Sequence, residues 1–177
     1  GELLSADRVI LPGVGAFGDA MKHLEQYGLS EVIREAADAG IPFFGICLGM
    51  QLLFSSSEES AGAAGLSLLP GRILKIPDSM PDPQGGIKKL KIPHMGWNVL
   101  RVNPASVLFS GLEENPYVYF VHSYYLKADD PEIVAARTDY GVSIDAGVEY
   151  KNIFGCQFHP EKSSDTGRKI LKNFLKL

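Results

Sequence analysis

The sequence is poor in cysteine and has no excess of basic residues. Only two of its 177 residues are cysteine, Cys47 and Cys156, which excludes the disulfide framework of a small secreted domain. Its 17 Lys and Arg residues are outnumbered by 21 Asp and Glu residues, and the net charge is -4. This balance provides no basic patch for nucleic acid or an anionic membrane, and no charged-then-apolar signal segment opens the chain. We therefore expect a cytoplasmic protein that binds small molecules and other proteins.

The sequence also lacks a long hydrophobic run. Its most apolar stretch, residues 41–54, is shorter than the roughly 20 residues that cross a bilayer and is interrupted by Gly45, Gly49 and Gln51. Hydrophobic residues make up 45% of the chain and charged residues 21%, as in ordinary globular proteins. A chain of this length can bury one core, so we expect a single domain over residues 1–177.

Strand and helix patterns alternate in the first third of the sequence. Residues 8–11 and 41–46 are apolar runs, and the second is typical of a strand buried on both faces of a parallel sheet. Three helices are predicted around these strands: one with Phe17, Met21 and Leu24 on one face, one from an N-cap at Ser30 to a stop at Gly40, and one over residues 48–56. The alternation predicts an α/β fold with a doubly wound, mostly parallel sheet.

The middle of the sequence predicts a mixed or antiparallel extension of this sheet. Turn-rich residues 77–86 separate strand patterns at residues 72–76, 98–102 and 117–122. Further strands are predicted at residues 133–137, 141–144 and 153–158. A last helix is predicted from Ser164 or Asp165, with Ile170, Leu171, Phe174 and Leu175 on one face.

A candidate nucleophile lies between the buried strand and the following helix. The segment GICLG at residues 45–49 matches the elbow in which small neighbours expose a nucleophile on a tight turn. Because a helix N-terminus favours the thiolate, we expect Cys47 to be acidic. A buried structural cysteine is the alternative. Cys156 has no second pair of metal ligands at suitable spacing, so we interpret it as a packing residue.

The segment His159-Pro160-Glu161 supplies the base that a cysteine nucleophile requires and a carboxylate to orient it. Pro160 disfavours a helical His159, so the side chains of His159 and Glu161 are expected on one side of an extended segment. The alternative is a loop histidine and glutamate without catalytic role. His94 and His122 lie in aromatic-rich segments and could be core or pocket residues.

Attack on an amide creates an oxyanion that needs hydrogen-bond donors. The backbone N–H of Leu48, just after the nucleophile, is the first candidate. The segment PGVG at residues 12–15 follows another strand end, where two glycines allow backbone N–H groups to be aimed at a ligand. A plain turn is the alternative for this segment.

Together these motifs resemble class I glutamine amidotransferases, on GICLGMQL at residues 45–52 and HPEKS at residues 159–163. Four segments narrow the resemblance to the glutaminase subunits of imidazole glycerol phosphate synthase: PGVGAFG at 12–18, PHMGWN at 93–98, HSYY at 122–125 and FGCQFHPEKS at 154–163. The similarity runs from Asp7 to the C-terminus. It implies that glutamine is hydrolysed and that ammonia passes to a partner cyclase, a (β/α)₈ barrel of histidine biosynthesis that makes imidazole glycerol phosphate and an aminoimidazole carboxamide ribotide.

The resemblance also implies residue roles, without a cofactor or metal. The nucleophile would be Cys47, the acid and base His159, and its support Glu161. The oxyanion would be held at Val14, Gly15 and Leu48. Glutamine would contact Gln51, Glu59, His122, Ser123 and Tyr124, and the cyclase would contact Met95, Trp97, Tyr119 and Lys162.

One departure from the family pattern concerns the start of the chain. Family members usually begin with a strand, a helix and a second strand that this sequence lacks, so we expect an incomplete chain with an exposed apolar sheet edge. Three other functions remain open: a glutaminase for anthranilate, carbamoyl phosphate or GMP synthesis, a stand-alone cysteine hydrolase, and a non-catalytic scaffold.

Overall fold

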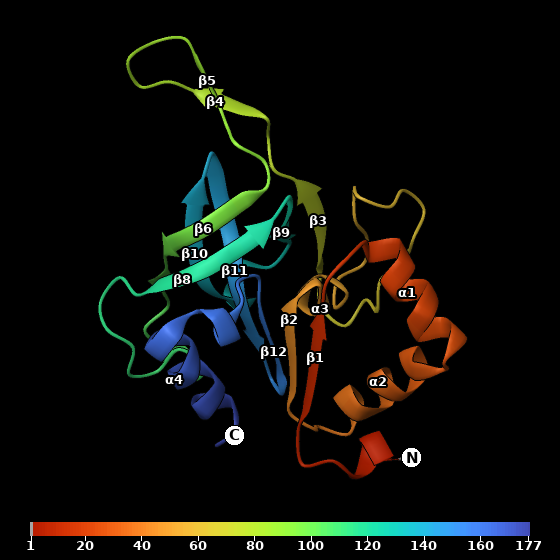
Figure 1. The fold of residues 1–177 in the computed structure, drawn as a ribbon. Helices are drawn as coiled ribbons and strands as arrows, with labels where there is room; N and C mark the ends of the chain where they lie inside the picture. Colours follow the sequence, from red (N-terminus) through yellow and green to blue (C-terminus); the bar gives the residue numbers. More distant parts are fainter. Residues whose placement is uncertain (1) are drawn as a thin grey trace.

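The computed structural model describes residues 2–177 and contains a central sheet with helices on both faces (Figure 1). The strands follow the order β1 (Val9–Gly13), β2 (Phe43–Cys47), β12 (Ile153–Cys156), β11 (Val142–Tyr150), β10 (Val134–Tyr140) and β7 (Arg101–Val102). The first three strands are parallel to one another, and the last three extend the sheet by antiparallel pairing. The predicted α/β class and the mixed extension are therefore confirmed.

Helices cover the two faces of the parallel strands. The helices α1 (Phe17–Gln26) and α2 (Leu29–Asp38) lie on one face, and α4 (Ser164–Phe174) lies on the other (Figure 1). Successive residues of β2 point to opposite faces, so Phe43 joins the core under α1, whereas Phe44 packs 5.1 Å from the ring of Phe174 on α4. Strand β2 is consequently buried along its whole length, as the sequence predicted.

Two helix predictions need correction. The helix predicted over residues 48–56 ends early, since α3 spans only Leu48–Gln51 and tighter turns follow it. All four residues of α3 are buried, so this segment has no solvent-exposed face on which a longer amphipathic helix could form. Ser30 is not the N-cap of α2, because Gly28, with φ of 65°, takes that position. The Ser30 hydroxyl is buried and has no hydrogen-bond partner among residues 2–177.

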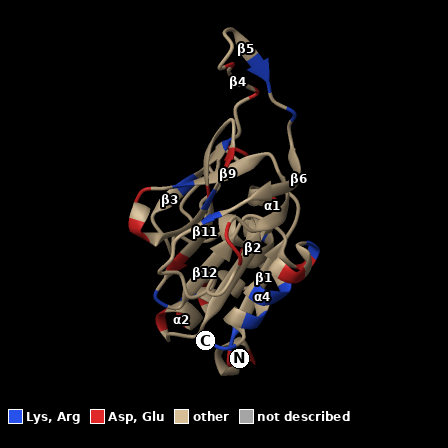
Figure 2. Cartoon of the chain, turned by 90° about the vertical axis from the view of Figure 1, so that its left-hand side faces the viewer, with Lys and Arg blue, Asp and Glu red and all other residues tan. Residues whose placement is uncertain are grey.

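The predicted middle strands mostly form separate two-stranded ribbons. The pairs are β3 (Gly71–Lys75) with β9 (Tyr124–Ala128), β4 (Ser79–Pro81) with β5 (Ile87–Lys89), and β6 (His94–Val99) with β8 (Tyr117–His122). The strand predicted at residues 98–102 is thus divided between β6 and β7. The β4–β5 hairpin projects from the rest of the chain (Figure 1), and β5, which contains Lys88 and Lys89, is coloured blue in Figure 2.

The described part of the chain also contains three short 3-10 helices, at Glu2–Ser5 (η1), Pro131–Ile133 (η2) and Pro160–Lys162 (η3). Within residues 2–177 no strand pairs with the free edge of β1, where the side chain of Ile10 is 42% exposed. Across the same residues, none of the helices has both the length and the apolar character needed to cross a membrane.

The contact between α3 and β1 predicts a stability defect in Gly49→Ala. A Cβ at Gly49 would overlap the backbone carbonyl oxygen of Leu11, so the helix or the strand must move. Such overpacking should cost about 3 kcal/mol or more, a fall of roughly 6–12 °C in Tm for a chain of this size. Thermal unfolding followed by circular dichroism measures it.

Gly18→Ala is the matched control for this prediction. The new Cβ would come 2.9 Å from Oγ and 3.0 Å from Cβ of Ser60 without overlapping any backbone atom, and Gly18 lies in α1, where alanine favours the helix. We expect its Tm to stay within a few degrees of the parent. Equal Tm values for the two variants would show that α3 does not depend on close contact with β1.

Candidate active site

A cavity of about 390 Å³ lies at the carboxyl ends of β1 and β2, which is where ligands bind in open α/β sheets. Its size is within the range of small-molecule sites. The cavity is lined by Val14, Gly15, Cys47, Leu48, Gln51, Glu59, Pro93, Val121, His122, Ser123, Tyr124, His159 and Lys162. Every residue predicted to bind the oxyanion or glutamine is therefore in one place, together with the predicted nucleophile and base.

Cys47 occupies the predicted elbow between β2 and α3. Its backbone has φ of 55° and ψ of -113°, a conformation that residues other than glycine rarely adopt. Glycine on each side makes the turn possible, because a Cβ at Gly45 would come within 2.7 Å of the backbone of Gly49 and Met50. The thiol is only 8% exposed, so the strained turn holds it at the cavity wall rather than in bulk solvent.

The prediction of an acidic Cys47 is wrong for this structure. Burial raises the pKa of the thiol to about 11, and the charge of Glu161 raises it further. The backbone N–H of Leu48, the Gln157 side chain and Lys162 lower the pKa without offsetting burial. Because α3 has only four residues, its N-terminus supplies little of the helix dipole on which the prediction relied.

His159 is held in position for use as a base. Its Nδ1 lies 2.8 Å from Oε1 of Glu161, so this nitrogen carries the hydrogen and Nε2 keeps a free lone pair. Nε2 is buried and has no hydrogen-bond partner in residues 2–177, although the ring lines the same cavity as Cys47. A base with an unused ring nitrogen in the cavity that a thiol also lines is suited to receive the proton of that thiol when substrate binds.

The backbone around His159 is fixed by two neighbours. His159 is extended, with φ of -101° and ψ of 98°, and Pro160 then begins η3 rather than continuing the extended segment that the sequence predicted. The N–H of His159 donates to the Tyr119 carbonyl at 2.9 Å. The Ser163 hydroxyl donates to the His159 carbonyl at 2.6 Å and accepts from the N–H of Tyr119 at 3.0 Å. These bonds tie the histidine to strand β8.

The predicted oxyanion segment forms an open turn at the cavity. Gly15 has φ of 100°, and Val14 is 83% exposed, so neither residue is held by side-chain packing. Two residues after Gly15, the N–H of Phe17 at the start of α1 donates a hydrogen bond of 2.8 Å to Oε2 of Glu59. This bond fixes the carboxylate where it can meet a cationic group in the cavity.

Gln157 belongs to the site but was not selected from the sequence. The side chain is fully buried, and its Nε2 lies 3.7 Å from Sγ of Cys47. Its Oε1 accepts a 2.8 Å hydrogen bond from Nε2 of Gln51. A polar residue inside the apolar run FGCQF was the signal that could have identified it.

The two histidines with open interpretations are both buried and joined to each other. Nδ1 of His94 lies 2.9 Å from Nε2 of His122, and His94 stacks against Phe120 and Tyr140. His122 lines the cavity and His94 lies behind it in the core. Burial lowers the pKa of His94 to about 4 and that of His122 to about 3, so both rings are neutral at pH 7.

Three of the predicted interface residues, Met95, Trp97 and Tyr119, lie on the β6–β8 ribbon outside the cavity lining, and the fourth, Lys162 on η3, is part of that lining. Met95 is 59% exposed and Trp97 is 52% exposed, and Trp97 packs edge-on against Tyr119 with ring centroids 6.1 Å apart. Lys162 is exposed and reaches the rim of the cavity. Exposed large apolar side chains beside a cavity are typical of a docking surface.

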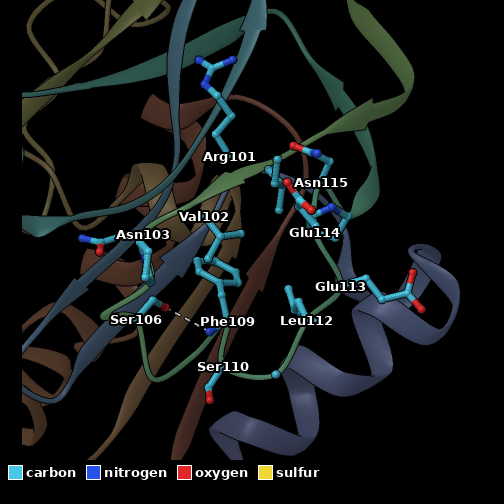
Figure 3. A pocket seen from close by; sticks show the side chains of 14 residues that line it. Arg101, Val102, Asn103, Ser106, Phe109, Ser110, Leu112, Glu113, Glu114 and Asn115 are labelled. Atoms are coloured by element: carbon cyan, nitrogen blue, oxygen red, sulfur yellow. Dashed lines mark hydrogen bonds between the residues drawn. The ribbon is translucent and has the colours of Figure 1, made fainter.

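A second hollow of about 510 Å³ is unsuited to the same chemistry (Figure 3). It is formed by residues 100–116, and the bond from the N–H of Phe109 to the Ser106 hydroxyl is part of its wall. Neither cysteine nor histidine is among the residues that line it. The smaller cavity around Cys47 is therefore the candidate active site.

Known proteins resemble this chain along nearly its whole length. The family model described as glutamine amidotransferase class-I matches residues 3–177. Three curated relatives carry the name imidazole glycerol phosphate synthase subunit HisH. The relative from Moorella thermoacetica is 49% identical over 98% of this chain and 78% of its own length. The relative from Syntrophotalea carbinolica is 48% identical over 96% and 81% of the two chains. The relative from Bacillus cereus is 51% identical over 98% and 78%. The chain belongs to the HisH family of class-I glutamine amidotransferases.

Solved structures support the fold of this HisH-family chain. A crystal structure titled glutamine amidotransferase superposes with a TM-score of 0.67 at 20% identity, over 95% of this chain and 79% of that one. The structure of PurLQS from Thermotoga maritima gives a TM-score of 0.64 at 24% identity, over 96% and 79% of the two chains. At these identities the likeness concerns the fold alone.

The site geometry predicts that a glutamine-mimicking chloroketone labels Cys47 and spares Cys156. Cys47 lines the cavity, whereas Cys156 is fully buried and its thiol donates to the Phe158 carbonyl at 3.4 Å. Burial also raises the pKa of Cys156 well above its usual range. Peptide mass mapping after brief exposure locates the label. Label on Cys156 ahead of Cys47 would contradict the choice of nucleophile.

The buried thiol also predicts how Cys47 reactivity depends on pH. Burial favours the neutral thiol, and only the thiolate reacts with iodoacetamide, so reactivity is gained as pH rises toward the pKa of about 11. The alkylation rate in the isolated chain should therefore rise about tenfold per unit between roughly pH 7 and 10. Time courses read by mass spectrometry measure it. A rate that is already level near pH 8 would indicate an acidic thiol instead.

Proposed function

We propose that this chain hydrolyses glutamine to glutamate and ammonia and delivers the ammonia to a partner cyclase subunit of imidazole glycerol phosphate synthase, in histidine biosynthesis. The observation that carries the proposal is the meeting of Cys47 with a His159 oriented by Glu161 at one cavity, in a chain of the HisH family. The described residues would act as one amidotransferase domain.

In the proposed reaction, Sγ of Cys47 attacks the side-chain carbonyl carbon of glutamine. Because the thiol rests in its neutral form, its proton passes to Nε2 of His159 as the S–C bond forms. The oxyanion receives hydrogen bonds from the N–H of Leu48 and from the turn at Val14 and Gly15. The C–N bond then breaks, His159 returns the proton to the leaving nitrogen, and water cleaves the thioester to give glutamate and restore the thiol.

The cavity walls supply groups for the other end of glutamine. Gln51 and Glu59 line the cavity with oxygen acceptors suited to an α-ammonium group, and the Glu59 carboxylate is already held by the N–H of Phe17. The segment from His122 to Tyr124 also lines the cavity, where its backbone can bind the substrate. These assignments follow the roles that the sequence resemblance implies.

The partner would dock on the β6–β8 ribbon beside the cavity. Met95 and Trp97 present exposed apolar surface there, Tyr119 supports Trp97, and Lys162 offers a positive charge at the rim. We infer from the resemblance that the partner is a (β/α)₈ barrel. Both cysteines are free thiols, which fits a reducing cytoplasm.

The decisive test separates ammonia production from ammonia use. In the assembled enzyme, Cys47→Ala should lower glutamine-dependent synthesis at least about 10³-fold, because the nucleophile is lost. Synthesis from added ammonium salts should remain, because the cyclase needs only ammonia. Cys156→Val is the control and should retain both activities, since it keeps a similar apolar volume in β12.

Other outcomes favour the alternatives. Equal loss of both activities in Cys47→Ala, with the complex intact, would count against a glutaminase role. Glutamate release by the isolated chain as fast as by the complex would favour a stand-alone hydrolase.

A further inference from the structure

A buried run of hydrogen bonds ends on the nucleophile. Gln157 contacts Sγ of Cys47 through Nε2 at 3.7 Å and accepts through Oε1 from Nε2 of Gln51 at 2.8 Å. The same Nε2 of Gln51 donates to the Tyr124 carbonyl at 3.1 Å. The side chain of Gln157 is fully buried, and that of Gln51 is 5% exposed. Solvent therefore cannot replace these partners.

The chemistry of the partners fixes which way each amide points. A backbone carbonyl can only accept, so Gln51 must present its NH₂ group to Tyr124. The other hydrogen of that group then requires an acceptor, which is Oε1 of Gln157. The NH₂ group of Gln157 is left facing Sγ of Cys47. Reversing Gln157 would put two NH₂ groups against each other and an oxygen against the sulfur.

Two histidines brace the far end of this run. The Tyr124 carbonyl also accepts from Nδ1 of His122 at 2.8 Å, which leaves Nε2 of His122 to accept from Nδ1 of His94 at 2.9 Å. Nε2 of His94 then faces the Asn98 amide nitrogen at 3.3 Å. Asn98 is itself oriented, because its Oδ1 accepts from the N–H of Val99 at 2.8 Å. Each donor nitrogen in the run therefore has at least one acceptor.

We propose that Gln157 is a further catalytic residue, whose amide N–H stabilises negative charge on Sγ of Cys47, and that Gln51 is the positioning residue that holds this amide in the donating orientation. The inference deepens the proposed glutaminase function and rests on it. Charge develops on Sγ when the proton leaves for His159 and again when the thioester is cleaved. A fixed donor on a fully buried side chain is most effective at those two moments.

Gln157→Met tests the donor, because methionine is similar in length and has no N–H. Below the pKa of Cys47, iodoacetamide alkylation of the isolated chain should slow by about three- to tenfold, and the whole pH–rate curve should move to higher pH. Gln157→Glu is the second variant, in which a carboxylate replaces the donor at the same length. Its curve should move further, since a negative charge would face the thiolate.

Cys156→Ala is the matched control for this experiment. It alters the adjacent residue of the same buried segment without touching Sγ of Cys47, because its thiol bonds to the Phe158 carbonyl. Its pH–rate curve for Cys47 should coincide with that of the parent. Circular dichroism identifies the variants that fold, and a folded Gln157→Met or Gln157→Glu with the parent's curve would overturn the proposal.

The alkylation readout does not depend on glutamine hydrolysis, so the two proposals fail separately. A wild-type complex that releases no glutamate would defeat the glutaminase function while the shifted pH–rate curve still stands. An unshifted curve in a fully active complex would defeat only the role of Gln157. In the complex, we expect Gln157→Met to lower kcat by a factor similar to its effect on alkylation.

Discussion

The close approach of β1, β2 and α3 at the Cys47 turn is the constraint on which the site depends. Glycines at positions 45 and 49 allow this approach, because neither position has room for a side chain. The backbone of Cys47 is forced to positive φ, which aims the thiol at the cavity formed by the ends of β1 and β2. The same turn delivers Gln51 to the cavity one helical turn later. Packing of backbone against backbone thus sets where the chemistry occurs.

Burial fixes the position of the Cys47 thiol, and it lowers the fraction of thiolate at neutral pH. A thiol whose pKa is about 11 is protonated at neutral pH, and His159 holds a lone pair without a partner. The nucleophile therefore rests as a neutral thiol, and negative charge develops on its sulfur only when a substrate carbonyl is in place to be attacked. This arrangement limits side reactions of a free thiolate. During the reaction, the negative charge on Sγ must then be stabilised by the fixed hydrogen-bond donors around it.

Short sequence motifs predicted those site residues whose geometry depends on nearby residues of the chain. GICLG and HPE predicted the elbow and the His159–Glu161 contact, because each depends on neighbours within a few positions. Gln157 escaped notice because its partners Cys47 and Gln51 are 110 and 106 positions away. The acidity of Cys47 was misjudged because a helix end can be read from sequence, whereas burial depends on the whole fold. Strand patterns likewise do not show which strands pair with each other, so the pairing of β6 with β8 in a separate ribbon was not predicted.

Strand β6 serves two purposes through the simple alternation of its side chains. His94 and Asn98 point inward to the polar run that braces the cavity, whereas Met95 and Trp97 point outward to solvent. Neighbouring residues of β6 are therefore under different structural constraints. The outward positions can diverge to suit a new partner while the inward ones keep the histidines neutral and oriented. A change of assembly partner in evolution would thus leave the architecture behind the nucleophile untouched.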